Sequence, residues 1–437
     1  MPERIPSIVI VGVQARAETC SPPVAENMLE TRPNRTAATW IAYLALIYFA
    51  LVLNCLGSVT SLIRLEQKLT YAQAGLLGSS FASGLIVASL VAAAVSRKLG
   101  SWKTLALAGA GLVSGCSLIC LGNDFPVILA GAFLAGTLGS LIISEVPLVL
   151  AQEHQGRSTA AFTEANALAS ASAIFAPAAV SLAERWHIGW RTALVAPVLL
   201  AVGAAVIFAF ARPRAPFRDR AVTVQKNRLG KAFWLSWSLL FFSVAAEFTI
   251  IFWATDYFRQ GEFGESAQAS GVLALFFLTM CTGRAIGGRL MLRLPSVAII
   301  LGSLAVALCG SFFYCLSFSM ASRLAGLALL GLGIANLYPT FLALAISNAK
   351  SHEVKASAKT TLASGLAILV FPFVLGGVAD LIGLGHAQLL IPSVLIGVLT
   401  VFLCSLRLAK TSKRRFECHE TPPIRGCSNS LPKTFPP

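Results

Sequence analysis

The sequence predicts an all-α polytopic membrane protein with twelve transmembrane helices, arranged as two parallel repeats of six. Composition, the spacing of apolar segments and an internal repeat lead to this fold class. Of the 437 residues, 56% are hydrophobic and 12% are charged, and the mean hydropathy is +0.76. A soluble domain carries about 25% charged residues, so the composition excludes an ordinary soluble protein. A collagen, a disulfide scaffold and a disordered chain are also excluded, because glycine has no three-residue period and cysteine is sparse.

Twelve apolar segments are long enough to cross a bilayer, which takes about 20 apolar residues. The spans of the first half are expected at 40–63, 71–95, 103–121, 126–150, 160–183 and 190–211. Those of the second half are expected at 233–255, 267–291, 297–317, 323–347, 358–381 and 385–407. The chain thus divides into a tail (1–39), a six-helix bundle (40–211), a basic linker (212–232), a second bundle (233–407) and a tail (408–437). Both tails are rich in Pro, Ser and charge, which is typical of disordered segments.

The formal net charge of +15 is concentrated beside the expected spans. The segment around the linker holds one acid and seven basic residues: Arg212, Arg214, Arg218, Arg220, Lys226, Arg228 and Lys231. With the N-terminus inside, sixteen Lys and Arg fall in inner loops and six in outer loops. Because basic loops face the cytoplasm, we expect a multi-pass protein of the cell (inner) membrane with both termini in the cytoplasm. No soluble domain remains to present the basic residues to nucleic acid, so no nucleic-acid partner is expected.

The two halves share a sequence repeat at an offset of 195 residues. Ala72-Gln73-Ala74 aligns with Ala267-Gln268-Ala269, and Leu129-Ala130-Gly131 aligns with Leu324-Ala325-Gly326. Matches in the fourth and fifth helices of each half lie within three residues of the same offset. Since each half has an even number of helices, the repeat is parallel. Six-plus-six parallel repeats are the layout of rocker-type secondary transporters, which hold substrate between their halves near the midplane.

Short motifs near the expected helix ends resemble those of a known family. The turn after the second helix contains Arg97 and Gly100, and the eighth helix ends in Gly283-Arg284-Ala285-Ile286-Gly287-Gly288, followed by Arg293. Gly189-Trp190-Arg191 precedes the sixth helix. Through these motifs, residues 40–407 resemble the major facilitator superfamily. The resemblance implies gating or structural roles for seven residues: Arg97, Gly100, Pro177, Arg284, Gly288, Arg293 and Pro372.

Two elements of that family are missing from the sequence. The motif after the second helix lacks its acid, and the Arg-x-x-Gln-Gly run of the drug-antiporter branches does not occur. Both departures weaken a drug-efflux function.

The resemblance also implies that the first, fourth, seventh and tenth helices line a central cavity. These helices carry the most conspicuous polar residues of the spans, which are Asn54, Glu145, Glu247, Asn336 and Tyr338. A polar or ionisable side chain inside a span is costly, so each is a candidate substrate-binding residue. Trp253 is a further candidate, because its ring can stack on a planar substrate or anchor the helix at the interface. Pro339 interrupts the tenth helix, which either exposes a carbonyl to substrate or bends the helix.

Glu247 and Glu145 are the candidate proton-coupling residues. A carboxyl group that faces an apolar cavity can load and release a proton near neutral pH, because desolvation disfavours its charged form. No histidine falls near the centre of a span, so carboxylates would have to carry the protons. At about 1.5 Å per residue, Glu145 and Arg284 lie at comparable depth, which permits an ion pair between the halves that could break and reform as the protein rocks. The alternative for each Glu is a structural hydrogen bond to a neighbouring helix.

These observations predict a secondary active transporter that moves a small organic solute by alternating access, coupled to protons, with uptake favoured. The acidic and amide-bearing lining favours a polar or cationic solute. A proton-driven exporter of drugs or metabolites is the alternative, and a membrane-embedded enzyme or a transport-fold receptor is a remote one. No enzymatic activity, cofactor or metal is expected, because Walker, Gly-x-Ser-x-Gly, HExxH and Cys/His motifs are missing. The expected partners are the substrate, protons and the lipid bilayer, and the expected state is a monomer.

Overall fold

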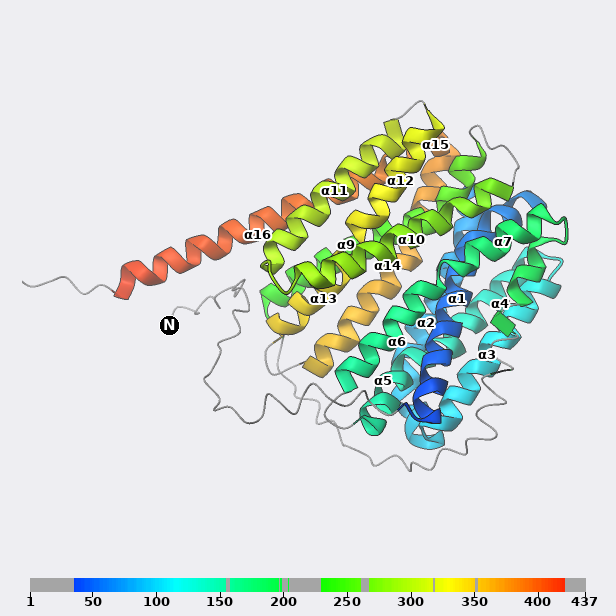
Figure 1. The fold of residues 1–437 in the computed structure, drawn as a ribbon, viewed down its shortest axis with the longest axis horizontal. Coiled ribbons are helices and arrows are strands. Elements are labelled where there is room, and N and C mark those ends of the chain that lie inside the picture. The colour runs from blue at the N-terminus through cyan, green and yellow to red at the C-terminus, as the bar shows by residue number, and fades with distance from the viewer. Residues whose placement is uncertain are drawn as a thin grey trace, which may run out of the picture.

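The computed structural model describes the backbone of residues 35–154, 158–195, 197–198, 203, 229–260, 267–316, 319–349 and 353–420. Within these residues the chain is helical and forms no β-strand. The helices run roughly side by side, as Figure 1 shows. A helix pairs its backbone groups within itself, which is what a bilayer interior requires.

The N-terminal half begins with three continuous helices, α1 (Ala37–Glu66), α2 (Tyr71–Leu99) and α3 (Ser101–Leu121). Its fourth crossing consists of α4 (Phe125–Gly139) and α5 (Leu141–Glu153), and its fifth of α6 (Ser158–Ser172) and α7 (Phe175–Arg185). The short 3-10 helix η2 (Trp190–Leu194) lies at the start of the sixth predicted span.

The C-terminal half repeats this order with α9 (Lys231–Arg259), α10 (Ala267–Leu290) and α11 (Ser296–Leu316). Its fourth crossing consists of α12 (Met320–Ile334) and α13 (Leu337–Asn348). The fifth is α14 (Glu353–Ile382), and the short α15 (Leu384–Ala387) precedes α16 (Leu390–Glu420). In Figure 1, α16 is the red helix that extends beyond the rest of the bundle.

Eleven helices of the described part of the chain are long and apolar enough to cross a membrane. They correspond to eleven of the twelve predicted spans, which confirms the all-α polytopic fold class. The other predicted span, 190–211, falls mostly outside the described residues. So do most of the basic linker and, apart from residues 35–39 and 408–420, both predicted tails.

Two predicted spans correspond to candidate membrane crossings, but their helices differ in extent from the prediction. Helix α16 continues to Glu420, past the predicted end of the span at residue 407, because no Gly or Pro stops it before Pro422. The predicted span 160–183 consists of two helices, since α6 ends at Ser172 and α7 begins at Phe175.

The fourth crossing of each half is also broken rather than continuous. The break lies at Ser140 in the N-terminal half and at Ala335 and Asn336 in the C-terminal half, again 195 residues apart. Pro339 accounts for the second break, because it has no N–H to donate to the carbonyl of Ala335. The interruption of the tenth helix predicted from the sequence is therefore confirmed.

The internal repeat is visible in the way the helices touch. A Cβ added to Gly136 of α4 would lie 2.0 Å from the carbonyl oxygen of Phe81 in α2. A Cβ added to Gly331 of α12 would lie 2.6 Å from the carbonyl oxygen of Phe276 in α10. Both the two glycines and the two phenylalanines are 195 residues apart. Glycine at these crossings allows the backbones of the second and fourth helices to touch.

The third and fourth helices of each half meet in the same way. Gly115 of α3 lies against the carbonyl oxygen of Gly131 in α4, with a distance of 2.7 Å from the added Cβ. Gly310 of α11 lies against the carbonyl oxygen of Gly326 in α12, with a distance of 2.9 Å. These residues also obey the 195-residue offset. The two halves are thus parallel structural repeats down to individual backbone contacts.

The halves are joined mainly by α1 with α9, α2 with α14 and α7 with α10, and α10 also contacts α6 and α1. We call outer the end of the bundle at which α1 and α9 finish, and inner the opposite end. A Cβ on Gly376 of α14 would come 2.4 Å from the carbonyl oxygen of Tyr71, at the outer start of α2. The halves therefore touch backbone to backbone at the outer end.

We predict that Gly136→Ala destabilises the protein, because the added Cβ meets a carbonyl in a fixed helix rather than a movable side chain. The expected loss is about 1–3 kcal/mol, as for other overpacked sites. Gly109→Ala in α3 is the matched control, since nothing lies within 4 Å of its Cβ. Thermal unfolding of the purified variants measures both. Equal midpoints for the two variants would contradict the close crossing.

Candidate functional site

A buried ion pair joins the outer ends of the first helices of the two halves. Asp256 of α9 has no exposed surface, and its Oδ1 accepts hydrogen bonds from Arg64 Nη2 at 2.8 Å and from Ser61 Oγ at 2.9 Å. Arg64 Nε lies 3.2 Å from both carboxylate oxygens. A buried charge is tolerated only when it is paired and hydrogen-bonded, so this contact holds α1 against α9.

A second contact joins the same end of α2 to α14. The carboxylate of Asp380 accepts hydrogen bonds from the backbone N–H groups of Tyr71 and Ala72, each at 2.8 Å. These are among the N–H groups at a helix N-terminus that have no partner within the helix, and the helix dipole favours a negative charge there. The guanidinium of Arg64 lies over the ring of Tyr71, at 4.4 Å from its centroid. Asp380 and Arg64 therefore bind the start of α2 from two sides.

A third contact joins α7 to the C-terminal half. Glu184 accepts a hydrogen bond from Arg259 Nη2 at 2.5 Å and one from the hydroxyl of Ser270, near the start of α10. Arg259 also donates to Ser270 at 2.9 Å. Arg64 and Arg259 are 195 residues apart, so the internal repeat places equivalent arginines in two different ion pairs between the halves. We call the Asp256, Asp380 and Glu184 contacts together the outer gate.

The residues of the outer gate were not among those predicted from the sequence. Its acids lie within one turn of a helix end, where they look like ordinary boundary charges. The available signal was the 195-residue spacing of Arg64 and Arg259, each in the last turn of an apolar helix. Their acidic partners come from distant segments, so pairing could not be read from the chain order.

Trp253 belongs to the outer gate rather than to an open cavity. It is completely buried, and its indole N–H donates to the carbonyl oxygen of Pro372 at 2.9 Å. Its ring also meets the ring of Tyr71 edge to face, with 5.7 Å between centroids. In this structure Trp253 thus links α9 to α14 and α2, and its ring is not available for stacking on a substrate. Pro372 lies inside the unbroken α14. Pro177 lies in the first turn of α7, just after the break that separates α7 from α6.

Polar residues from four helices meet nearer the middle of the molecule. Arg284 of α10 donates through Nη1 to Ser170 Oγ of α6 at 2.6 Å and through Nε to the carbonyl of Ala335 at 3.4 Å. Its Nη2 lies 3.9 Å from Oε1 of Glu247 in α9. Tyr338 of α13 lies beside both Glu247 and Arg284. We call these residues the central cluster. It contains Glu247, Arg284 and Tyr338, which were predicted separately, and Ser170, which was not.

The break between α12 and α13 holds the side chain of Arg284 in place. The side-chain amide of Asn336 donates to the carbonyl of Gly283 at 3.0 Å, and a Cβ on Gly287 would overlap its amide at 2.0 Å. The carbonyl that Pro339 leaves without a helical partner is that of Ala335, which accepts from Arg284. Asn336 and the Gly-Arg-x-x-Gly motif thus form one packed unit.

The predicted ion pair between Glu145 and Arg284 is not formed, because Arg284 faces Glu247 instead. Glu145 is 1% exposed and lies beside the hydroxyl groups of Ser96 and Ser101, without a hydrogen bond of ordinary geometry to either. These serines flank the turn between α2 and α3, where Gly100 has a φ of +80°. Ser96 stands where the family motif has its acid. The buried carboxyl of α5 therefore reaches the place that the motif's acid would occupy.

The remaining predicted residues are more loosely placed. Asn54 is buried in α1 and donates from its amide to the carbonyl of Ala50, one turn earlier, at 2.7 Å. Arg97 and Gly288 are exposed near the inner ends of α2 and α10, Arg293 is exposed in the turn after α10, and no atom lies within 4 Å of a Cβ on Gly288. Nothing in the structure brings these four residues into the central cluster.

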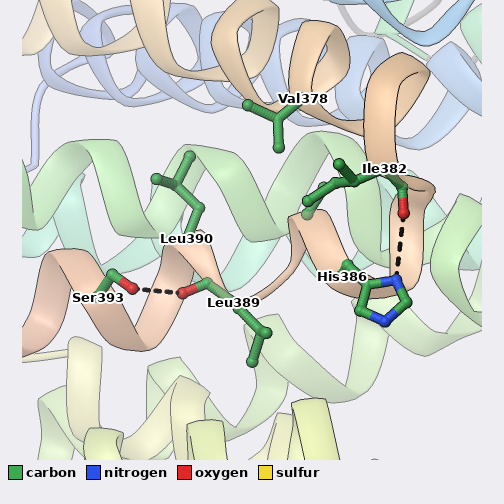
Figure 2. Close-up of a pocket in the computed structure, with 7 residues that line it drawn as sticks. Val378, Ile382, His386, Leu389, Leu390 and Ser393 are labelled. Atoms are coloured by element: carbon green, nitrogen blue, oxygen red, sulfur yellow. Dashed lines mark hydrogen bonds between the residues drawn. The ribbon is translucent and has the colours of Figure 1, made fainter.

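An apolar groove of about 590 Å³ lies at the outer end of the C-terminal half (Figure 2). It is formed by α14, α15 and the start of α16, and includes Val378, Ile382, His386, Leu389, Leu390 and Ser393. Its polar groups are used locally, since Ser393 Oγ donates to Leu389 at 2.8 Å and His386 Nδ1 lies 3.1 Å from the carbonyl of Ile382. The groove contains none of the predicted site residues and is separate from the central cluster.

Helix order, the parallel repeat and the polar residues between the halves point to one family, and sequence comparison decides the matter. Residues 42–372 match the Major Facilitator Superfamily. The chain belongs to this superfamily. The superfamily assignment confirms the resemblance stated from the sequence and, with it, the prediction of a transporter rather than an enzyme.

Similar proteins show how far this superfamily likeness extends. The membrane protein MosC of Rhizobium meliloti is 31% identical over 157 residues, which is 36% of this chain and 38% of MosC. A variant of the nucleoside transporter NupG has a TM-score of 0.68 at 12% identity, and covers 85% of this chain and 100% of its own. A proton-dependent oligopeptide transporter has a TM-score of 0.68 at 13% identity, and the match covers 86% of this chain and 99% of that transporter. A bacterial homologue of the lysosomal transporter Spinster has a TM-score of 0.66 at 12% identity, with 90% and 100% covered. These structures share the superfamily fold.

We predict that Asp256→Asn opens the outer gate, because it removes the charge that pairs with a mostly buried arginine (16% exposed). Breaking such a pair costs about 3–5 kcal/mol in the closed state. Spin labels on Cys residues introduced at Leu121 and Leu381, both exposed at the outer end, measure the separation of the halves in a variant whose reactive native cysteines are serine. The expected result is a second, longer distance.

Arg191→Gln is the matched control for this experiment. Arg191 also pairs with a carboxylate, Glu66, at 2.6 Å, but this pair is one-third exposed and lies within the N-terminal half. Exposed pairs contribute about 0–1 kcal/mol, so the distance distribution should stay unchanged. An identical distribution for Asp256→Asn and Arg191→Gln would show that the Asp256 contact does not hold the halves together.

Proposed function

We propose that this superfamily member is a proton-coupled secondary transporter that takes up a small organic solute by alternating access, with Glu247 carrying the proton. One observation carries this proposal. Arg284 touches an acid of its own half, Glu247, and at the same time a hydroxyl of the other half, Ser170. Protonation of Glu247 therefore changes the charge balance at a contact between the halves.

The charge on Glu247 determines how firmly Arg284 is held. When Glu247 is ionised, its carboxylate attracts the guanidinium across 3.9 Å, in a setting where both side chains are mostly buried. When Glu247 is protonated, that attraction is lost and Arg284 keeps only Ser170 and Ala335 as partners. Both residues lie on helices of the C-terminal half that pack against the N-terminal half. Loading a proton would then loosen one arrangement of the halves and favour another.

The other predicted residues receive roles consistent with their positions. Asn54, Asn336 and Tyr338 are proposed to line the substrate path, and Glu145 is proposed as a second protonatable group that acts on the inner turn around Arg97 and Gly100. The closed outer gate corresponds to a state that opens inward. We further propose that the protein is a monomer in the inner membrane with both termini in the cytoplasm. That arrangement follows from the distribution of basic residues.

Proteoliposomes test the coupling. Purified protein is reconstituted with a pH-sensitive dye inside, and compounds are added outside under an inward proton gradient. Nucleosides and short peptides come first, because transporters named for them share the fold. Amino acids, sugars and organic acids follow. A substrate should acidify the lumen and accumulate.

We predict that Glu247→Gln abolishes proton entry and accumulation but retains exchange of labelled for unlabelled substrate. A neutral amide cannot carry the proton, whereas exchange requires only that the loaded protein reorient. The matched control is Glu153→Gln at the inner end of α5, which changes a carboxylate that bonds Thr36 within the same half. If Glu247→Gln accumulates substrate as well as the parent protein, Glu247 is not the proton carrier. Accumulation of the substrate in the lumen driven by an outward proton gradient would instead favour the proton-driven exporter.

A further inference from the structure

Arg284 differs from the other paired arginines of the described residues. Arg35, Arg64, Arg191 and Arg259 each donate a hydrogen bond to a carboxylate oxygen, and the last three lie 2.5–2.8 Å from it, so each of these charges has a hydrogen-bonded acidic partner. The carboxylate beside Arg284 lies at 3.9 Å, beyond hydrogen-bond distance. The Arg284 side chain is also 31% exposed, whereas that of Glu247 is 12% exposed. The charge of the Arg284 guanidinium, between the two halves, is thus balanced by a nearby carboxylate that does not accept a hydrogen bond from it.

We propose that Arg284 binds the charged group of the substrate, and that this substrate is an organic anion with a carboxylate or similar planar group. This inference rests on the proposed transport function and names its substrate class. Guanidinium offers five N–H donors in a flat fork that fits two carboxylate oxygens at once. Nε and Nη1 are already engaged by Ala335 and Ser170, which fix the plane of the fork. Within the part of the chain that the structure describes, Nη2 makes only the long contact to Glu247.

Glu247 and the anion would compete for the same cation. Among the described residues, Arg284 from α10 lies 3.9 Å from Glu247, and Tyr338 from α13 is within range of its charge. With Glu247 ionised, an incoming carboxylate meets a like charge and an arginine that is already compensated. With Glu247 protonated, the arginine is left without a counter-charge, and an anion restores the balance. Proton and anion therefore bind cooperatively, and each raises the affinity for the other by the same factor.

The cluster disfavours a cationic solute, one of the two kinds, polar or cationic, that the acidic and amide-bearing lining favoured in the sequence. Arg284 would repel a cation approaching Glu247, and like charges brought together cost several kcal/mol. Tyr338 and the neighbouring Ser364 offer neutral polar groups for the rest of the solute. With one cation in the cluster, the ligand expected is a monoanion with a polar body.

Equilibrium binding to the purified full-length protein in detergent tests this inference without any gradient. The probes are acetate, benzoate and gluconate, each paired with an uncharged analogue, namely acetamide, benzamide and sorbitol. Thermal stabilisation is titrated at constant ionic strength, at pH 8 and at pH 5.5. Wild type, Glu247→Gln, Arg284→Gln and the double variant are compared, with Arg289→Gln as the control for an exposed arginine on the same helix.

At pH 8, at least one anion should bind Glu247→Gln at least about tenfold more tightly than wild type, a change of about 1.4 kcal/mol. Wild type should approach the Glu247→Gln affinity at pH 5.5. Arg284→Gln and the double variant should lose anion binding at both pH values, and Arg289→Gln should behave as wild type. Neutral analogues should show no such pattern.

Anion binding that is equal in Glu247→Gln and in the double variant would overturn the inference, as would the absence of stabilisation by every anion. If Arg284→Gln does not fold, Arg284→Lys replaces it. Lysine keeps the charge but not the fork, so affinity should fall while the preference for anions stays. Cooperative anion binding without proton entry in proteoliposomes would refute the coupling proposed above and leave the anion site standing.

Discussion

The arrangement of the two halves depends on a carboxylate that water does not reach. Asp256 is completely enclosed at the outer end of α9, and its charge is balanced by Arg64 of α1. An isolated buried charge is far more costly than a buried pair, so the two helices cannot separate gradually. They either keep this contact or exchange it for hydration of both groups. Such an all-or-none contact is what gives a rocking protein distinct states.

Helix α9 connects this contact to the central cluster. Asp256 and Glu247 lie nine residues apart on it, which is about 14 Å along a straight helix. Trp253 lies between them and is bonded to the carbonyl of Pro372 in α14. A tilt of α9 would therefore move the outer gate and Glu247, the proposed proton carrier, together, and Trp253 is the hydrogen-bonded contact between α9 and α14 in between. Coupling of this kind needs only one rigid helix.

The internal repeat explains why two separate contacts between the halves are both arginine–carboxylate ion pairs. Arg64 and Arg259 are equivalent residues, yet one binds an acid on α9 and the other an acid on α7. The glycines at the helix crossings give the two halves matching backbone contacts, whereas the acids that meet the arginines differ. The halves are thus packed alike internally but are joined to each other by contacts that are not interchangeable.

The sequence alone determined the fold class, the helix order and the repeat, because apolar segment length and a fixed offset are properties of the chain itself. It also identified Glu247, Arg284, Asn336 and Tyr338 as unusual, since a polar residue inside a span is costly wherever it lies. The tertiary structure decided which of them meet. Depth along a helix suggested Glu145 as the partner of Arg284, but depth says nothing about the direction in which a side chain points, and Glu145 turns toward Ser96 instead. For the same reason Trp253 proved to be packed at the gate, and Asp256 and Asp380 could not be recognised as gate residues. Their importance comes from pairing with residues about 190 and 310 positions away, and only folding brings those positions together.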